Sequence, residues 1–162
     1  MNNLSAKEKI ETCLEELNKI DKLIDGMGKL SNPVPYLTKY AIIKSCGTIE
    51  YCFKTILSDI HNGQSSQVIN FINNMFRNSS INPSKENICK SLSRFDKNWN
   101  DTFKDTLKNH PNKAKLESSL TSLNSARNTF AHGGQPSASF ENVVDYFKDS
   151  VEIIKILDNI VA

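Results

Sequence analysis

The sequence of 162 residues contains no apolar run of membrane-spanning length, no internal repeat and no low-complexity tract. It also has little excess charge, since 20 Lys and Arg stand against 18 Asp and Glu. These absences exclude a membrane-spanning protein and a bulk-basic nucleic-acid binder, and the length predicts a single domain over residues 1–162. The polar N-terminal segment has no signal-peptide pattern, so we expect a cytoplasmic protein without a membrane partner.

Metal-ligating patterns are also missing. The four cysteines, Cys13, Cys46, Cys52 and Cys89, form no C-x-x-C pair, and no histidine lies at zinc-ligand spacing from them. Three of the four lie in or beside apolar helical stripes, which favours buried thiols in a reducing compartment. The sequence therefore predicts neither a metal site nor a cofactor.

No stretch alternates apolar and polar residues with a period of two, so no sheet is expected. Helical periodicity instead recurs along the chain and predicts an all-α bundle of about five to seven helices. Ser5 and Glu8 suggest a capping box for the first helix, and Asn82 and Pro83 suggest the start of a later one. The expected helices cover residues 5–27, 42–60, 68–76, 83–107, about 113–132 and about 139–161.

The most informative segment lies at the end of the helix predicted for residues 113–132. One apolar stripe of that helix is formed by Leu116, Leu120, Leu123 and Phe130. Arg127 falls within this stripe, where an unpaired buried guanidinium would cost several kcal/mol. It must therefore meet an anion, a paired carboxylate or a wet cleft. Gly133 and Gly134 predict a helix C-terminus, which places His132 in the last turn.

Two interpretations of this segment remain open. An Arg and a His at a helix end are commonly a cap and a surface ion pair. Alternatively, Arg127 is a phosphate ligand beside His132, a residue type suited to proton transfer near neutral pH. Asn128 lies four residues before His132, on the same helix face.

Several matching pieces lie in the same order within residues 82–162. They are Asn82-Pro83, Phe95-Asp96-x-x-Trp99, Ala126-Arg127-Asn128-x-x-Ala131-His132-Gly133 and Val144-x-Tyr146-Phe147. In these pieces the chain resembles the HEPN superfamily (higher eukaryotes and prokaryotes nucleotide-binding domains), in particular its RiboL-PSP type. The first 80 residues are similar only as helices that begin the bundle.

The resemblance implies an HEPN-like helical bundle, a homodimer and, in active members, a metal-independent endoribonuclease. The R-x4-6-H motif of the family corresponds to Arg127 and His132, with Asn128 at the polar position after the arginine. The resemblance thus implies these three as catalytic residues, an RNA substrate, and products with 2′,3′-cyclic phosphate and 5′-hydroxyl ends. A toxin or antiviral-defence effector, restrained by a separately encoded antitoxin or regulator, is the expected role. The alternatives are a catalytically silent module that binds RNA, nucleotide or protein, and a structural scaffold.

Other polar and aromatic residues have simpler interpretations. Glu50 could pair with Arg127 across the bundle, although a surface carboxylate is the commoner outcome. We expect Tyr146 at the edge of the core, Trp99 in the core or an interface, and His61 and His110 as helix caps.

The final helix predicts the location of a dimer surface. Ile153, Ile156 and Ile160 add a second apolar face to the stripe that contains Phe147 and Val151. A helix that is apolar on most sides is either central in its own domain or shared with a partner. The sequence therefore predicts a homodimer that uses the final helix and the motif helix.

Overall fold

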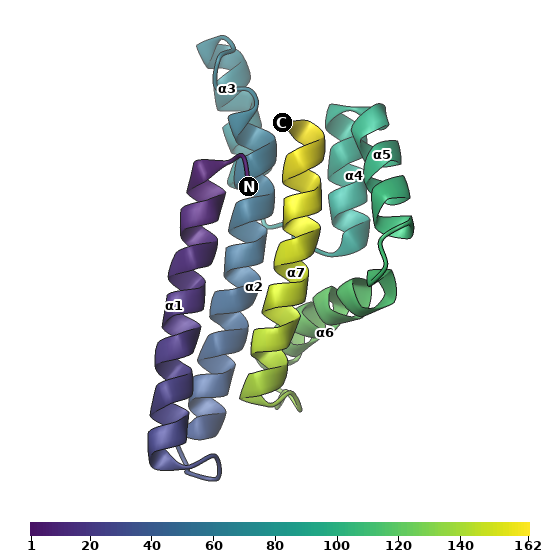
Figure 1. Cartoon of the computed structure of the whole chain (residues 1–162). Coiled ribbons are helices and arrows are strands. Elements are labelled where there is room, and N and C mark those ends of the chain that lie inside the picture. Colours follow the sequence, from purple (N-terminus) through teal and green to yellow (C-terminus); the bar gives the residue numbers. More distant parts are fainter.

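The computed structural model describes all of residues 1–162, and its ordered elements are all helical (Figure 1). It contains seven α-helices and one short π-helical segment, η1. The elements are α1 (Leu4–Met27), α2 (Val34–Asp59), α3 (Ser66–Ile72), η1 (Asn73–Arg77), α4 (Lys85–Phe95), α5 (Lys97–Lys108), α6 (Lys113–Ala131) and α7 (Phe140–Val161). This architecture confirms the all-α bundle that the sequence predicts. No helix in it combines the length and the apolar character needed to cross a membrane.

The long helices α1, α2 and α7 run side by side along the molecule, and the antiparallel pair α4 and α5 lies beside α7 (Figure 1). Helix α6 crosses behind the lower part of α7 and packs against both α7 and α2. Helix α7 therefore contacts α1, α2, α5 and α6, which makes it the central element of the bundle. This arrangement positions the C-terminal end of α6 next to α2.

Helix α2 begins at Val34 rather than at the expected residue 42. Three other helices are capped by side chains that the sequence analysis did not assign. Helix α1 begins one residue before Ser5, because the Oδ1 atom of Asn3 accepts the backbone N–H of Ala6 at 2.9 Å, so the predicted capping box does not form. Helix α4 is capped by Ser84 rather than Asn82. The expected helix 83–107 is two helices, because Asp96 has an extended backbone and its side chain caps α5. In each of these three helices the side chain of the N-cap residue accepts a backbone N–H of the first turn. Apolar periodicity does not show which residue is the N-cap.

Most helix ends are where the sequence places them. Gly28 ends α1 with a φ of 88°, and Ser139 forms a capping box with Asn142 at the start of α7. The expected helix 68–76 is shorter than predicted, because its second half adopts the wider π-helical turn of η1. The ion pair between Arg77 and Asp59 then joins η1 to the end of α2.

The final helix is apolar on several faces because it is central within one chain. Ile153 and Ile154 are completely buried among the neighbouring helices, and Ile156 and Ile160 pack against the same core. These isoleucines are therefore not a free dimer surface. The apolar faces of α7 are explained by its central position in one chain, so they no longer argue for a dimer surface on this helix.

The cysteines are free thiols, and three of them are buried. Burial raises the pKa of Cys46 to about 11 and that of Cys52 to about 12, because the apolar surroundings disfavour a thiolate. These side chains thus behave as small apolar core residues, as the sequence predicts.

Candidate functional site

The first three residues of the predicted α6 stripe, Leu116, Leu120 and Leu123, are buried in the core. Phe130 is not, because this residue, near the end of the helix, is 37% exposed. The buried face instead continues through Asn124 and Ala126. The end of α6 therefore rises out of the core, and its last turn lies at the surface.

Arg127 lies on the side of α6 that faces α2, and it is half-buried. Its positive charge acts on Cys46 of α2, where it opposes the effect of burial on the pKa of that thiol. The only hydrogen bond that its side chain makes runs from Nη1 to the Oδ1 atom of Asn128, at 3.3 Å. No carboxylate lies within ion-pair distance of the guanidinium, so Arg127 keeps most of its donors free.

Glu50 does not pair with Arg127. Its Oε1 atom instead accepts from the Nζ atom of Lys54, one helical turn further along α2, at 2.5 Å. The buried Lys54 also donates to the carbonyl oxygen of Ser79, which links α2 to the segment before α4. A buried ammonium needs a nearby anion, so the carboxylate of Glu50 stays paired with Lys54 and does not contact Arg127.

His132 is the C-cap residue of α6, and it is exposed. Its backbone N–H donates to the carbonyl oxygen of Asn128 at 3.1 Å, but no hydrogen bond joins the two side chains. The structure thus brings Asn128 to Arg127 and leaves the imidazole of His132 without a protein partner. Both the guanidinium and the imidazole are therefore available to a ligand.

Gly133 and Gly134 end α6 in a Schellman motif. The N–H of Gly133 donates to Phe130, and the N–H of Gly134 donates to Thr129 at 2.8 Å. Gly133 has a φ of 80°, which disfavours any residue with a Cβ atom. A Cβ on Gly134 would lie 2.8 Å from the Cγ2 atom of Thr129 and 3.0 Å from its carbonyl oxygen. The glycine pair therefore turns the chain sharply and determines where His132 stands.

We expect Gly133→Ala to lower the free energy of unfolding by about 1–2 kcal/mol, because an L residue in the left-handed region is strained. The matched control is Gly26→Ala, which changes a helical glycine whose added Cβ would meet nothing within 4 Å. That control should raise stability by up to about 1 kcal/mol. Urea denaturation of the two variants measures both effects. Equal stability of Gly133→Ala and the wild type would contradict the strained cap.

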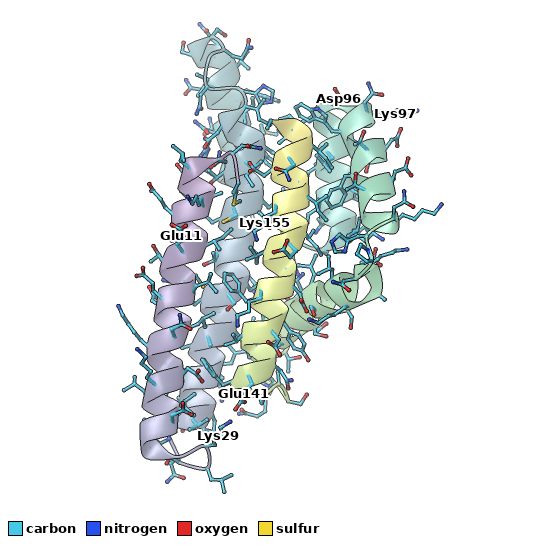
Figure 2. The ribbon with its side chains drawn as sticks, in the orientation of Figure 1. Glu11, Lys29, Asp96, Lys97, Glu141 and Lys155 are labelled. Atoms are coloured by element: carbon cyan, nitrogen blue, oxygen red, sulfur yellow. The ribbon has the colours of Figure 1, made fainter.

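Two grooves flank the segment that follows the glycine pair. One, of about 450 Å³, lies between this segment and the α1–α2 loop and includes Lys39 and Phe140. At its edge, Lys29 and Glu141 form an ion pair at 2.5 Å (Figure 2). The other, of about 360 Å³, includes Ser125 and Tyr146. Ser125 is about 200° from Arg127 around an ideal helix, so this second groove lies on the other side of α6.

The remaining histidines are already engaged in local contacts. The Nδ1 atom of His110 accepts the N–H of Asn112 at 3.1 Å within the turn before α6, but the caps of α5 and α6 are Asn109 and Asn112, so His110 is not the predicted helix cap. His61 is not a cap, because its ring stacks on Phe95 with a centroid distance of 5.3 Å. Trp99 and Tyr146 both pack at the edge of the core, as expected. No group of His, Cys, Asp or Glu side chains is arranged to hold a metal ion.

Sequence reasoning missed the contacts that connect α6 to α2. The Sγ atom of Cys46 donates to Asn124 at 3.4 Å, and the Nδ2 atom of Asn124 donates to the carbonyl oxygen of Pro83 at 3.4 Å. Lys39 places its Nζ atom 5.7 Å from the ring centroid of Phe130. The sequence feature that could have indicated these contacts is Asn124, which lies three residues before Arg127 on the same face of α6.

Comparison with protein families supports and extends the sequence resemblance. A family model described as RiboL-PSP-HEPN matches residues 8–162, so the similarity includes the N-terminal helices as well as the segment after residue 82. Comparisons with curated proteins and with solved structures gave no match.

Proposed function

Because the chain belongs to the RiboL-PSP-HEPN family, we propose that it is a metal-independent endoribonuclease whose reaction depends on Arg127, Asn128 and His132. Family membership by itself is compatible with either a ribonuclease or an RNA-binding role. The observations that favour catalysis are a guanidinium without a carboxylate partner and an exposed imidazole without a hydrogen-bond partner, both near the C-terminal end of α6.

The reaction that suits these residues uses the RNA's own nucleophile. His132 accepts the proton of a 2′-hydroxyl group, and the resulting 2′-oxygen attacks the adjacent phosphorus atom. The bond from phosphorus to the 5′-oxygen then breaks, and the leaving oxygen takes a proton. The products are a 2′,3′-cyclic phosphate and a 5′-hydroxyl, and DNA is inert because it lacks the nucleophile.

Arg127 stabilises the charge that develops on the non-bridging phosphate oxygens. A guanidinium can donate two parallel hydrogen bonds to a phosphate, and its charge does not depend on pH in the working range. Asn128 holds the Nη1 end of that guanidinium, so we assign it a positioning role toward Arg127 rather than His132.

The proposed partners and biological role rest on what the family resemblance implies. We propose RNA as the substrate, a homodimer as the active form, and a toxin or antiviral-defence effector as the cellular role. A separately encoded antitoxin or regulator is the partner that would restrain such an activity.

The proposal predicts that the purified protein cleaves single-stranded RNA in the presence of a metal chelator. Fragment ends distinguish the mechanism, because cyclic phosphates resist phosphatase until acid opens them, whereas metal-dependent nucleases commonly leave other ends. An RNA oligonucleotide with one 2′-O-methyl group should be resistant at that position only, since the methyl group removes the nucleophile.

Intact RNA under these conditions, together with RNA retention that Arg127→Ala abolishes, would identify a silent RNA-binding module instead. Retention that falls steeply with added salt would support that alternative, because phosphate contacts release counterions. RNA behaviour unaffected by either Arg127→Ala or His132→Ala would indicate a scaffold.

A further inference from the structure

Positive charge is concentrated in one region of the chain, although the net charge of the whole chain is only +2. Residues 77–115 contain nine Lys and Arg against four Asp and Glu. The structure places four of these cations around one groove of about 520 Å³ between α4 and α5, which we call the basic groove. They are Lys85, Lys90, Arg94 and Lys104. Glu86 is the only acidic residue in its lining, so positive charge dominates the groove.

Other grooves of the molecule lack this concentration of charge. The groove that includes Phe140 contains two lysines and one glutamate, and the groove that includes Tyr146 contains no charged residue. A further groove beside Gly47 contains two cations and one glutamate. The gathering of four cations is therefore a property of the α4–α5 surface and not of the grooves of this protein in general.

Two of the four cations, Arg94 and Lys104, are exposed and have no carboxylate within ion-pair distance. The buried Asn100 of α5 helps to hold Lys104 in place. With its amide oriented so that both polar atoms are satisfied, its oxygen accepts from the Nζ atom of Lys104 at 3.1 Å and from the Oγ atom of Ser93 at 2.8 Å. A neutral amide orients an ammonium without neutralising it, so both cations keep their charge for a ligand.

The other two cations form ion pairs that a ligand can replace. The Nζ atom of Lys85 lies 2.6 Å from the Oε1 atom of Glu117 on α6, and that of Lys90 lies 2.7 Å from the Oε1 atom of Glu86. Even the least exposed of these four side chains, Glu117, is 26% exposed. Exposed pairs of this kind contribute at most about 1 kcal/mol, so a phosphate can compete for either lysine.

The composition of the basic groove indicates the class of its ligand. Its lining contains no aromatic and no aliphatic residue, and Cys89 is its only apolar member. Protein interfaces are usually centred on aromatic and apolar side chains, and nucleobases stack on aromatic faces. Cationic donors without apolar neighbours instead match the oxygen atoms of phosphates. The groove therefore suits a phosphodiester backbone better than an acidic protein segment or a free nucleotide.

We infer that the basic groove binds the phosphodiester backbone of single-stranded RNA, independently of its base sequence. The choice of RNA rests on the proposed function. The pair between Lys85 and Glu117 joins the groove to α6, ten residues before Arg127, which is about 15 Å along an ideal helix and about 80° around it. An RNA chain in the groove can thus continue along α6 toward the candidate site. The groove retains the substrate, while the residues at the end of α6 act on one phosphate.

Binding of an RNA that cannot be cleaved tests the groove separately from catalysis. A short oligouridylate with a 2′-O-methyl group at every position keeps the phosphates but lacks the nucleophile. Arg94→Gln and Lys104→Gln together should weaken its binding about 25-fold at about 0.1 M salt. The steepness of log K against log salt should fall by about 1.4, because each phosphate contact to a single strand contributes about 0.7. Fluorescence anisotropy over a salt series measures both effects.

The matched control is Lys19→Gln together with Lys22→Gln, which removes the same charge from exposed positions on α1. It should weaken binding by no more than about threefold, because salt screens charges that do not contact the strand. Both double variants should melt within about 2 °C of the wild type, as expected for surface positions. Wild-type affinity in the groove variant would overturn the inference. An equal loss in the α1 control would also overturn it, since that result would indicate a diffuse effect of net charge.

Cys89 reports on the groove directly, because it is the one cysteine that is not buried and it belongs to the lining. Burial raises the pKa of the Cys89 thiol, and the charges of Lys104 and Lys85 oppose this rise, so both cations act at this position. At about ten times the dissociation constant of the oligouridylate, labelling of Cys89 by iodoacetamide should slow about tenfold, because only unbound chains react. Mass spectrometry of the labelled peptide measures the rate.

Other polyanions identify what the groove recognises. Single-stranded DNA of the same length should protect Cys89 as well as the oligouridylate does, since contacts to phosphates carry no sequence information. Protection by poly-glutamate but not by the oligouridylate would overturn the inference and identify an acidic protein segment as the ligand. Equal protection by inorganic phosphate at the same phosphate concentration would overturn it in favour of a small anion.

The inference and the proposed function can fail separately. Groove-dependent binding of the oligouridylate by a protein that leaves unmodified RNA intact would refute the proposed function alone. Cleavage of unmodified RNA together with wild-type affinity in the groove variant would refute the basic groove alone.

Discussion

Arg127→Ala and His132→Ala should each abolish most RNA cleavage while leaving the melting temperature within about 2 °C of the wild type. Loss of one donor to a transition-state oxyanion lowers rates by about 10²–10³-fold, and loss of a general acid or base lowers them by about 10²–10⁴-fold. Cleavage of a fluorescent RNA and a thermal melt on the same samples measure both quantities.

The expectation that the melting temperature of Arg127→Ala stays near that of the wild type comes from the contacts of Arg127. Removing one partner of a buried ion pair costs about 3–5 kcal/mol, because the other charge is left unpaired. Arg127 has no such partner, and its only side-chain hydrogen bond is to the neighbouring Asn128. A large fall in melting temperature for Arg127→Ala would therefore show that the guanidinium is structural, and the catalytic assignment would fail.

Matched substitutions separate the site from general effects of charge and residue type. Lys19→Ala removes the same charge from an exposed position on α1, and His110→Ala removes a histidine that caps a turn. Neither should change cleavage by more than about twofold, apart from the weak salt dependence of polyanion binding. Arg127→Lys is expected to recover only part of the activity, since an ammonium cannot donate in the bidentate geometry of a guanidinium.

Ile153→Ala should destabilise the fold far more than Arg127→Ala or His132→Ala, although Ile153 is not part of the candidate site. Ile153 is completely buried on α7, and truncating such a side chain costs about 2–5 kcal/mol. Each kcal/mol lowers the melting temperature of a chain of this size by about 2–4 °C. Urea denaturation at low protein concentration measures the loss without a contribution from dimer dissociation.

Ile43→Ala is the control for this prediction, because Ile43 is 41% exposed on α2. It should lower the free energy of unfolding by less than about 0.5–1 kcal/mol, the usual range for surface positions. An Ile153→Ala variant as stable as Ile43→Ala would contradict the assignment of Ile153 to the core.

The sequence by itself determined the features that depend on local interactions. Helical periodicity, the helix end at the glycine pair after His132 and the start of α7 near residue 139 all involve residues within one or two turns of each other, and the structure has each of them. The cysteine spacings likewise indicated free thiols. The motif Arg127-Asn128-x-x-x-His132 could be located for the same reason, since its members share one helix end.

Only the tertiary structure decided which distant groups meet. The sequence allowed an ion pair between Glu50 and Arg127. In the structure the carboxylate of Glu50 instead pairs with the buried ammonium of Lys54, so Arg127 has no carboxylate partner. Similarly, Ile153 and Ile43 both look like surplus apolar residues of an amphipathic helix. Ile153 is buried and Ile43 is exposed, because α7 is surrounded by other helices while one face of α2 is left uncovered. Periodicity records how many faces of a helix are apolar, but packing determines which face the chain itself covers.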